Sequence, residues 1–460
     1  TDSTGNTYIT GAISQPNPYA TTAPVDFDPS SGVPNVLAPG GYVAKYSRSG
    51  ALLWAIGADQ PTSFSLQPDN TYIPSGGGSQ NGIATDGSGN VFVVGSFSGQ
   101  VTFGSISLAS TTDNSGNYQT NIFVAKLDAN GNYVWVQTFA ASNATGIALD
   151  STGNAYVTGA FGRQATFGSF TVSPPGGVSD TFIVKLNTSG TVLWADGIGN
   201  TVVDNGADGV GANGIAVDGN GNAYIAGGYT GTVDFDPGTG TYDLTSMNRR
   251  GGYPSEDIFV MKVNTNGGFL WADSMGSAST YGDYANAIAV DGAGNVLITG
   301  TFASSDFSSA ANNNDFDPGK GTYKLNPSNG HGFVEKLDTN GKFVWALNLN
   351  AQPFTIATDS SGNVYVGGAF QGTVDFNPGT RTYNLTSAGG NDGFVLELNS
   401  SGSFIAAVDM GGTGNDGVNA IVIDPLGDIY ATGVFQQTAT FGSTSLTSNG
   451  GADIFVAKLQ

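Results

Sequence analysis

The chain has 460 residues and a formal net charge of −22, from 36 acidic and 14 basic residues. This balance argues against nucleic acid and anionic membrane surfaces as partners, because both attract clustered Lys and Arg. Cysteine is absent, which excludes disulfides and thiolate metal sites, and no apolar run approaches the roughly 18 residues of a membrane span.

One pattern recurs along the whole chain. Each copy opens with an aspartate in a D-x-x-G-N/D turn, and a short apolar run ending in glycine follows, as in TYITG at 7–11. The aspartates of the successive copies are Asp2, Asp86, Asp150, Asp218, Asp291, Asp359 and Asp424. Alternating β-branched and aromatic residues between Gly, Asn and Asp clusters are typical of strands joined by tight turns. A lone meander is marginal in water, so the copies must stack to bury a core.

Two further strands follow in each copy, and both carry a recurring side chain. The third has the form F-V-x-K-L, and its basic position holds Lys45, Lys126, Lys185, Lys262, Lys336 and Lys458, with Glu397 in the sixth copy. The fourth ends in an aromatic residue: Trp54, Trp135, Trp194, Trp271 or Trp345, with Phe404 assigned to that place in the sixth copy. Because all five tryptophans share one repeat position, we interpret them as packing elements. We expect the lysines to meet a carboxylate of the same or the adjacent copy.

In chain order, we expect repeats at about 1–55, 82–139, 146–199, 214–276, 287–349, 355–411 and 420–460. The first lacks its inner strand and the last its outer strand, so both are incomplete. One explanation is that these residues belong to a longer polypeptide. The other is that a neighbouring molecule donates the missing strand, which would make the protein a subunit of an assembly.

A period near 70 residues made wholly of strands suits radial sheets around an axis. The combination of D-x-x-G-N-x-Y-V-x-G, then F-G or D-F-D-P, then D-x-F-V-x-K-L-D and G-x-x-x-W resembles the bacterial SBBP-type β-propeller repeat over essentially the whole chain. The fold expected is therefore all-β: a seven-bladed β-propeller of four-stranded antiparallel blades, with an extra hairpin-like segment per blade. We expect a single domain over residues 1–460. The resemblance implies a secreted or cell-surface protein and no particular reaction.

The D-F-D/N-P-G segments are candidate calcium sites. They place pairs of oxygen-bearing side chains on one side of an extended strand, and paired carboxylates repel unless a cation lies between them. These residues are Asp26, Asp28, Asp234, Asp236, Asp315, Asp317, Asp375 and Asn377. The alternative is that Asp-Pro-Gly forms a tight turn while the first Asp is solvated. For the aspartates of the D-x-x-G-N turns, the turn explanation is favoured over calcium.

Length variation is concentrated at 196–212, 246–256, 273–286 and 303–313, in connections that we expect to emerge on one face. Such a face is where we expect a protein or glycan partner to bind. The single histidine, His331, rules out a histidine-based zinc site, and no acidic pair stands out as catalytic. The function expected is a non-catalytic secreted or surface binding or scaffold module, stabilised by calcium. A structural assembly subunit and a carbohydrate-active enzyme are the alternatives.

Overall fold

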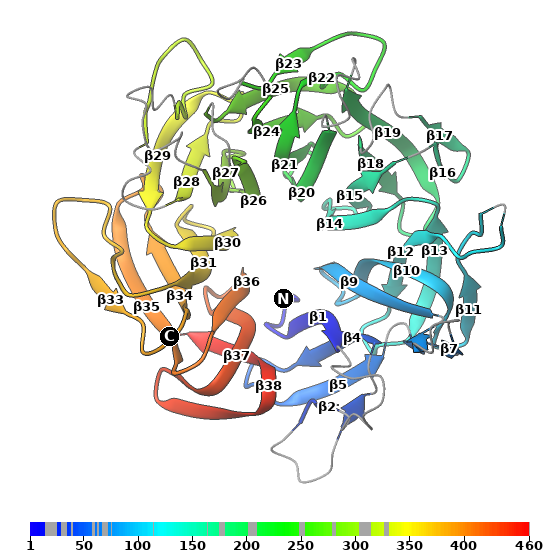
Figure 1. Cartoon of the computed structure of the whole chain (residues 1–460), viewed down its shortest axis with the longest axis horizontal. Helices are drawn as coiled ribbons and strands as arrows, with labels where there is room; N and C mark the ends of the chain where they lie inside the picture. Colours follow the sequence, from blue (N-terminus) through cyan, green and yellow to red (C-terminus); the bar gives the residue numbers. More distant parts are fainter. Residues whose placement is uncertain are drawn as a thin grey trace. The chain divides into compact units, whose positions relative to one another are not determined.

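The structure is a computed structural model of the chain. It describes residues 1–13, 25–28, 35–37, 40–57, 60–61, 64–66, 72–74, 76–113, 115–162, 164–173, 180–200, 209–247, 254–277, 282–302, 314–325 and 331–459. Over these ranges the chain forms strands and turns and no helix, which confirms the all-β class (Figure 1). Within the same ranges there is therefore no helix that could span a bilayer.

Each sequence repeat folds as an antiparallel meander whose strands pair in chain order. In repeats 2 and 3 the meanders are β9 (Gly76–Thr85), β10 (Val91–Phe103), β12 (Thr120–Leu127) and β13 (Tyr133–Phe139), then β14 (Asn143–Leu149), β15 (Ala155–Phe161), β18 (Asp180–Leu186) and β19 (Val192–Asn200). In repeats 4 and 5 they are β20 (Gly209–Val217), β21 (Ala223–Thr230), β24 (Glu256–Val263) and β25 (Phe269–Met275), then β26 (Tyr284–Val290), β27 (Val296–Thr301), β28 (Gly332–Leu337) and β29 (Phe343–Leu349). Repeat 6 contributes β30 (Gln352–Thr358), β31 (Val364–Phe370), β34 (Asp392–Leu398) and β35 (Phe404–Gly412). These are blades of the β-propeller type.

The first and seventh repeats contribute three-stranded meanders in the described residues. They are β1 (Thr7–Ile13), β4 (Gly40–Tyr46) and β5 (Leu52–Gly57), and β36 (Gly417–Ile423), β37 (Ile429–Phe441) and β38 (Thr444–Leu459). The remaining short strands lie outside the meanders: β2 (Val25–Asp26), β3 (Val36–Leu37), β6 (Gln60–Pro61), β7 (Phe64–Leu66), β8 (Tyr72–Pro74), β11 (Ile106–Ala109), β16 (Ala165–Phe167), β17 (Phe170–Val172), β22 (Thr232–Asp234), β23 (Asp243–Thr245), β32 (Thr373–Asp375) and β33 (Asn384–Thr386).

Most of these short strands form the extra hairpin that the sequence predicts between the second and third strands. In unit 2, defined below, the hairpins of repeats 4, 5 and 7 pair or form a bridge with the end of the outer strand of the preceding repeat. Gly199 at the end of β19 pairs with Asp234 of β22, and Gly411 of β35 pairs with Thr440 of β37. A single bridge joins Gly276, just after β25, to Asp315. A hairpin encoded in one repeat therefore extends the sheet of the repeat before it.

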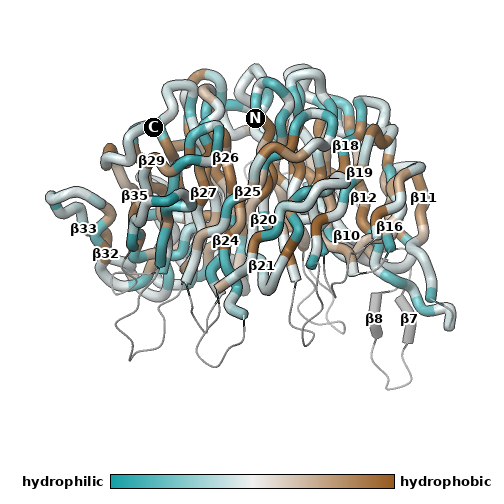
Figure 2. Tube along the Cα trace, turned by 90° about the horizontal axis from the view of Figure 1, so that it is seen from above, coloured by the Kyte–Doolittle hydropathy of each residue, from teal (hydrophilic) through white to brown (hydrophobic). Residues whose placement is uncertain are grey.

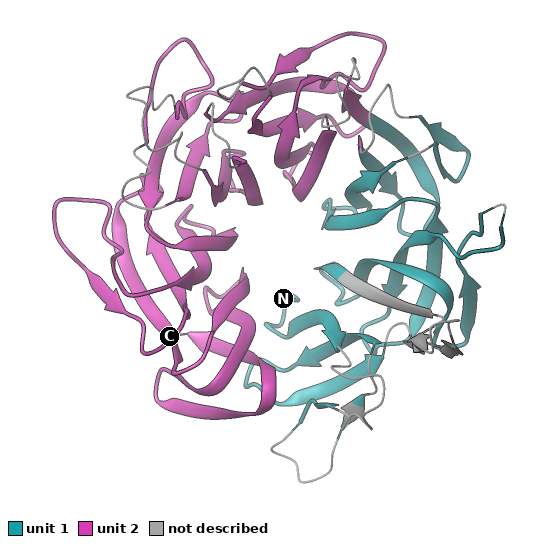
Figure 3. Ribbon diagram, in the orientation of Figure 1, with its two compact units in different colours: residues 1–174, 181–197 teal, residues 175–180, 198–460 magenta. Residues whose placement is uncertain are grey.

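Contacts between residues divide the chain into two compact units (Figure 3). Unit 1 comprises residues 1–174 and 181–197, and unit 2 comprises residues 175–180 and 198–460. The single-domain organisation expected from the sequence remains a prediction.

The core lies between the meanders of neighbouring repeats. In unit 2 one apolar cluster joins Val260 and Met275 of repeat 4 to Ile298 and Phe333 of repeat 5. This follows from strand geometry, because alternate side chains of a strand point to opposite faces of its sheet. In a repeat with a neighbour on each side, both faces are therefore covered. Figure 2 shows the same pattern, with the hydrophobic segments of the trace lying mainly within strands.

Candidate functional site

The recurring tryptophan and lysine both contact the turn between the third and fourth strands of the next repeat. The indole Nε1 of Trp271 donates to the carbonyl oxygen of Thr339 at 3.3 Å, and Lys262 Nζ donates to the same oxygen at 3.1 Å. The equivalent indole bonds are Trp54 to Ala129 (3.2 Å), Trp135 to Thr188 (3.1 Å) and Trp345 to Ser400 (3.2 Å). Trp194 packs edge-on against Tyr156 of its own repeat, with ring centroids 6.0 Å apart. Four of the tryptophans, and the lysines of the same repeats, therefore join successive repeats within a unit.

The recurring lysine also pairs with the aspartate of the D-x-x-G-N turn in its own repeat. Four such pairs occur, at 3.5 Å for Lys45 and Asp2, 3.3 Å for Lys185 and Asp150, 3.9 Å for Lys262 and Asp218, and 2.9 Å for Lys336 and Asp291. Lys126 lies 4.9 Å from the centre of the Phe92 ring, and Lys458 pairs with Asp428 at 2.6 Å. All four paired lysines are nearly buried, so each cation is held in one place.

The turn aspartates use their carboxylate oxygens within the turn itself. Asp218 Oδ1 accepts the backbone N–H groups of Asn220 and Asn222, both at 2.9 Å, and Oδ2 accepts the Asn222 amide and the Tyr224 hydroxyl. In the equivalent Asp150, burial raises the pKa, but the hydrogen bonds from Thr152 and Asn154 outweigh it and hold the pKa at about 2. These contacts show that the recurring aspartate stabilises the turn through hydrogen bonds from its own side chain.

Repeat 6 departs from the pattern at both positions. Glu397 replaces the lysine and accepts a hydrogen bond from the Tyr365 hydroxyl at 3.0 Å. The assignment of Phe404 to the tryptophan position is wrong, because Glu397 pairs in register with Ala406, as Lys336 pairs with Trp345. Phe404 instead pairs with Leu398. It is equivalent to Phe343, which pairs with Leu337 across the same bulge in repeat 5.

The candidate calcium residues of the D-F-D/N-P-G segments cap their own hairpin loops. Asp234 Oδ1 accepts the N–H groups of Asp236 and Tyr242 at 3.0 and 2.8 Å, and Asp236 Oδ1 accepts that of Gly238 at 2.9 Å. The same bonds recur at Asp315 and Asp317, at Asp375 and Asn377, and in part at Asp26 and Asp28. In the described part of the chain, no three Asp, Glu, His or Cys side chains form a group that could hold a metal ion. Calcium binding at these residues remains a prediction.

The hairpin of repeat 6 differs from the others in unit 2, because β32 and β33 form a separate two-stranded sheet. In the described residues no strand pairs with the outer side of β29, which is the edge of its sheet. Gly276 and Gly411, which pair with a hairpin, occupy the same repeat position. In repeat 5 that position is Asn350. At Gly411 a Cβ would lie 2.6 Å from the Asp392 side chain, whereas repeat 5 has His331 at the position of that aspartate.

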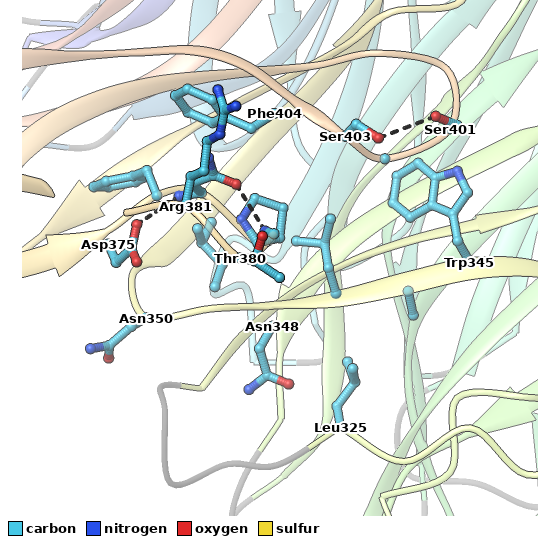
Figure 4. A pocket seen from close by; sticks show the side chains of 18 of the residues that line it. Leu325, Trp345, Asn348, Asn350, Asp375, Thr380, Arg381, Ser401, Ser403 and Phe404 are labelled. Atoms are coloured by element: carbon cyan, nitrogen blue, oxygen red, sulfur yellow. Dashed lines mark hydrogen bonds between the residues drawn. The ribbon is translucent and has the colours of Figure 1, made fainter. Parts of the chain in front are cut away.

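A groove with a volume of about 1160 Å³ occupies the space between β29 and this hairpin (Figure 4). Its lining combines aromatic and polar side chains and includes Tyr323, Trp345, Asn350, Asp375, Arg381 and Ser401. The hydrogen bonds of Asp375 and Asn377 fix one wall of the groove. The opposite wall is the turn at 399–403, where Asn399 Oδ1 accepts the N–H groups of Ser401 and Ser403 at 3.0 and 2.9 Å. The groove thus has hydrogen-bonded walls and lies beside a sheet edge to which no strand of the described residues pairs.

Arg381 is exposed in this groove, and it makes no ion pair among the described residues. The equivalent residues of repeats 4 and 5 are Gly240 and Gly321, which lie against the carboxylates of Asp236 and Asp317 too closely to accept a Cβ. Repeat 6 has Asn377 in place of that aspartate. Two linked changes therefore make this hairpin less acidic and place a guanidinium in the groove.

Most of the insertion face expected from the sequence lies outside the described residues, including 201–208, 248–253, 278–281 and 303–313. His331 is described, and its Nδ1 lies 3.2 Å from the carbonyl oxygen of Phe302. Sequence reasoning missed Asn350, Arg381 and Glu335, which is discussed below. Aligning the repeats would have revealed Glu335 and Arg381, which replace an apolar residue and a glycine, and Asn350, which replaces the glycine of repeats 3, 4 and 6.

No protein-family model matches the chain. The chain is 27% identical over 253 residues to an uncharacterized WD repeat-containing protein of Acanthamoeba polyphaga mimivirus, and the match spans 50% of this chain and 17% of that protein. This chain is a β-propeller-type repeat protein. Similar solved structures include Sqt1 from Chaetomium thermophilum (8% identity, TM-score 0.40, 93% of this chain and 91% of that chain) and the Dos1 propeller (10% identity, TM-score 0.39, 93% and 87%).

Proposed function

We propose that the chain is a non-catalytic binding module of the SBBP type, and that its groove between repeats 5 and 6 takes an extended polypeptide. The observation that carries this proposal is the groove beside β29, because no strand of the described residues pairs with the outer side of β29, whereas the outer strands of repeats 3 and 6 pair with a hairpin. A sheet edge binds an extended peptide by main-chain hydrogen bonds, and flanking pockets select its side chains. The secreted or cell-surface location belongs to the same proposal and rests on the repeat resemblance. Extracellular fractionation of the source cells would test it.

Arg381 indicates the chemistry of the partner. A guanidinium recognises carboxylates through paired N–H donors. It is one of only 14 basic residues in a strongly acidic chain, and six of these occupy the recurring lysine position. We therefore expect a peptide with an acidic side chain near the hairpin of repeat 6.

The proposal can be tested by selecting peptides from a phage-displayed random library on the intact chain. Thr380→Trp should obstruct the groove and weaken the selected peptides about tenfold or more, because a bulky ring would occupy their path. Thr239→Trp is the matched control, since Thr239 is the exposed counterpart in the hairpin of repeat 4. Arg381→Gly, which installs the residue of the sister hairpins, should weaken acidic peptides selectively.

Backbone N-methylation of a selected peptide separates strand addition from side-chain docking. Methylation at alternate residues should abolish binding, because it removes the N–H donors that pair with β29. Peptides that bind Thr380→Trp as tightly as the unchanged chain would refute the groove as the site. A polysaccharide that binds there instead would support the glycan alternative, and its cleavage in a reaction lost in Asp375→Asn would support the enzyme alternative.

A further inference from the structure

Glu335 is a fully buried acid at a position that is otherwise apolar. It is the middle residue of FVEKL in β28, and its counterparts are Ala44, Ala125, Val184, Met261, Leu396 and Ala457. Its exposed fraction is 0%, and neither carboxyl oxygen has a hydrogen-bond partner among the described residues. In register it lies between Ile298 of β27 and Ala346 of β29, both members of the apolar cluster between repeats 4 and 5. Burying a carboxylate without a partner costs far more than burying the neutral acid, so this site favours the protonated form.

The side chain of Glu335 points toward repeat 4. Phe333 and Leu337 lie two residues before and after it and therefore share its face of the strand. Both pack into the apolar cluster that Met275 of repeat 4 also joins. The protonation state of Glu335 therefore acts at the contact between the two repeats.

The charges nearest to Glu335 are acidic. Asp273 comes from β25 of repeat 4, and Asp315 and Asp317 come from the hairpin segment 314–325 of repeat 5. Burial first, and then the charges of Asp273, Asp317 and Asp315, raise the pKa of Glu335 well above its ordinary value. Burial also raises the pKa of Asp273, to about 7. A negative charge on Glu335 would therefore meet other acids at the junction.

The other titratable groups of the surrounding elements do not offset this charge. The basic residues of β24, β28, the hairpin segment and the turn after β28 are Lys262, Lys320, Lys324, Lys336 and Lys342. Lys262 and Lys336 pair with the turn aspartates of their own repeats, Asp218 and Asp291, and the other three lysines are exposed. The hydroxyl of Tyr224, which also packs into the cluster, donates to Asp218. Among the described residues no lysine or arginine forms an ion pair with the buried glutamate.

We propose that Glu335 makes the junction of repeats 4 and 5 a pH-sensitive switch. With its proton, the side chain packs as a neutral group between the two repeats. After loss of the proton, the carboxylate is stabilised only where water reaches it, which requires the repeats to separate at this point. The closed junction thus holds a proton that the open one releases, and the closed form is favoured at low pH. Above the ordinary pKa of a glutamate, the open fraction should rise by up to about tenfold per pH unit, until the raised pKa of the closed form is passed.

A single introduced thiol can report this opening, because the chain has no cysteine. Ala285 of β26 is fully buried in the cluster between repeats 4 and 5, so Ala285→Cys should react with a maleimide only when the junction opens. Ala144→Cys is the matched control. Ala144 is the counterpart of Ala285 and is fully buried in the cluster between repeats 2 and 3, where Val184 occupies the position of Glu335.

The measurement is the ratio of the two labelling rates, in which the titration of the thiol itself cancels. Between pH 5 and pH 8 this ratio should rise about tenfold or more in the chain that keeps Glu335. It should stay level in Glu335→Met, which installs the residue of repeat 4, and in Glu335→Gln, which keeps the shape of the side chain without a titrating proton. The glutamine variant gives the answer if the methionine variant does not fold. A level ratio in the chain that keeps Glu335 would overturn the proposal, and so would an equal rise in the variants.

Discussion

The indole Nε1 of Trp345 donates to the carbonyl oxygen of Ser400, 3.2 Å away in the next repeat, and its ring lies over Gly402. Lys336 Nζ donates to the same oxygen at 3.3 Å. One carbonyl thus receives both recurring side chains of the preceding repeat. The turn at 400–402 therefore receives both hydrogen bonds and the packing of the indole ring from the preceding repeat.

Trp345→Phe should lower the free energy of unfolding by about 1–2 kcal/mol, because it removes this hydrogen bond and part of the buried ring area. Urea unfolding followed by far-ultraviolet circular dichroism measures the change. Tyr118→Phe, at a ring that is 43% exposed, is the control and should leave the midpoint unchanged. Equal midpoints for both variants would show that the indole bond contributes nothing.

Gly402→Ala should destabilise the chain more than Gly50→Ala. Both glycines have positive φ, +80° and +86°, so both substitutions incur a backbone penalty of about 1 kcal/mol. At Gly402 the new Cβ would also lie 3.0 Å from the Trp345 ring, whereas nothing lies within 4 Å at Gly50. The difference between the losses of unfolding free energy in the two variants therefore measures the effect of the close contact with the Trp345 ring. Equal losses would show that this contact has no effect on stability.

Glu397→Lys should stabilise repeat 6 by about 1 kcal/mol, because it restores a cation beside the turn aspartate Asp359. Lys336 provides the precedent, 2.9 Å from Asp291 in repeat 5. Glu397→Gln is the matched control, since it removes the negative charge without adding a positive one. If the lysine variant unfolds at lower urea than the glutamine variant, the cation gives no stabilisation there.

Stability should fall as the pH rises from about 4 to about 7. Burial raises the pKa of Asp257 to about 7, although the Met247 N–H and the Ser255 hydroxyl donate to its carboxylate. The folded chain therefore holds a proton that the unfolded chain has released above about pH 4, and this contribution is lost by about pH 7. Asp257→Asn should reduce the loss of unfolding free energy over this pH range by an amount on the order of 3 kcal/mol. Unfolding free energies at pH 4.5, 6 and 7.5 give the comparison, and parallel profiles for both chains would contradict it.

The repeat pattern predicted the strands well, because each strand lies between turn residues whose chemistry is local. Asp218 and Asn222 form their turn from their own side chains, so the turn can be read from the sequence. Spacing also places Ala406 and not Phe404 at the tryptophan position, because the G-x-x-x-W pattern counted from Gly402 ends at Ala406, which pairs with Glu397. The bulge between Glu397 and Leu398 recurs at the same place in the other repeats, so it does not change this count.

The contacts between repeats were less predictable, because they join residues 53 to 75 positions apart. The sequence indicated that Lys262 has a carboxylate partner, yet nothing in it pointed to the carbonyl of Thr339 in the next repeat. Glu335 could have been found by aligning the third strands. That the charge of Asp273 acts on Glu335 becomes evident only once β25 and β28 are known to contribute to one apolar cluster.

The pairing of Gly411 with Thr440 bears on how such a chain can lengthen. A hairpin encoded in one period completes the outer strand of the period before it, so duplicating one period of the gene copies both partners of the joint. Where the copied period is one that pairs in this way, the inserted copy would supply an edge strand to its predecessor and receive one from its successor. No strand edge would then be left exposed to promote aggregation. Arrays of this kind can thus gain or lose whole periods, whereas insertion of a fraction of a period would separate a hairpin from the strand that it completes.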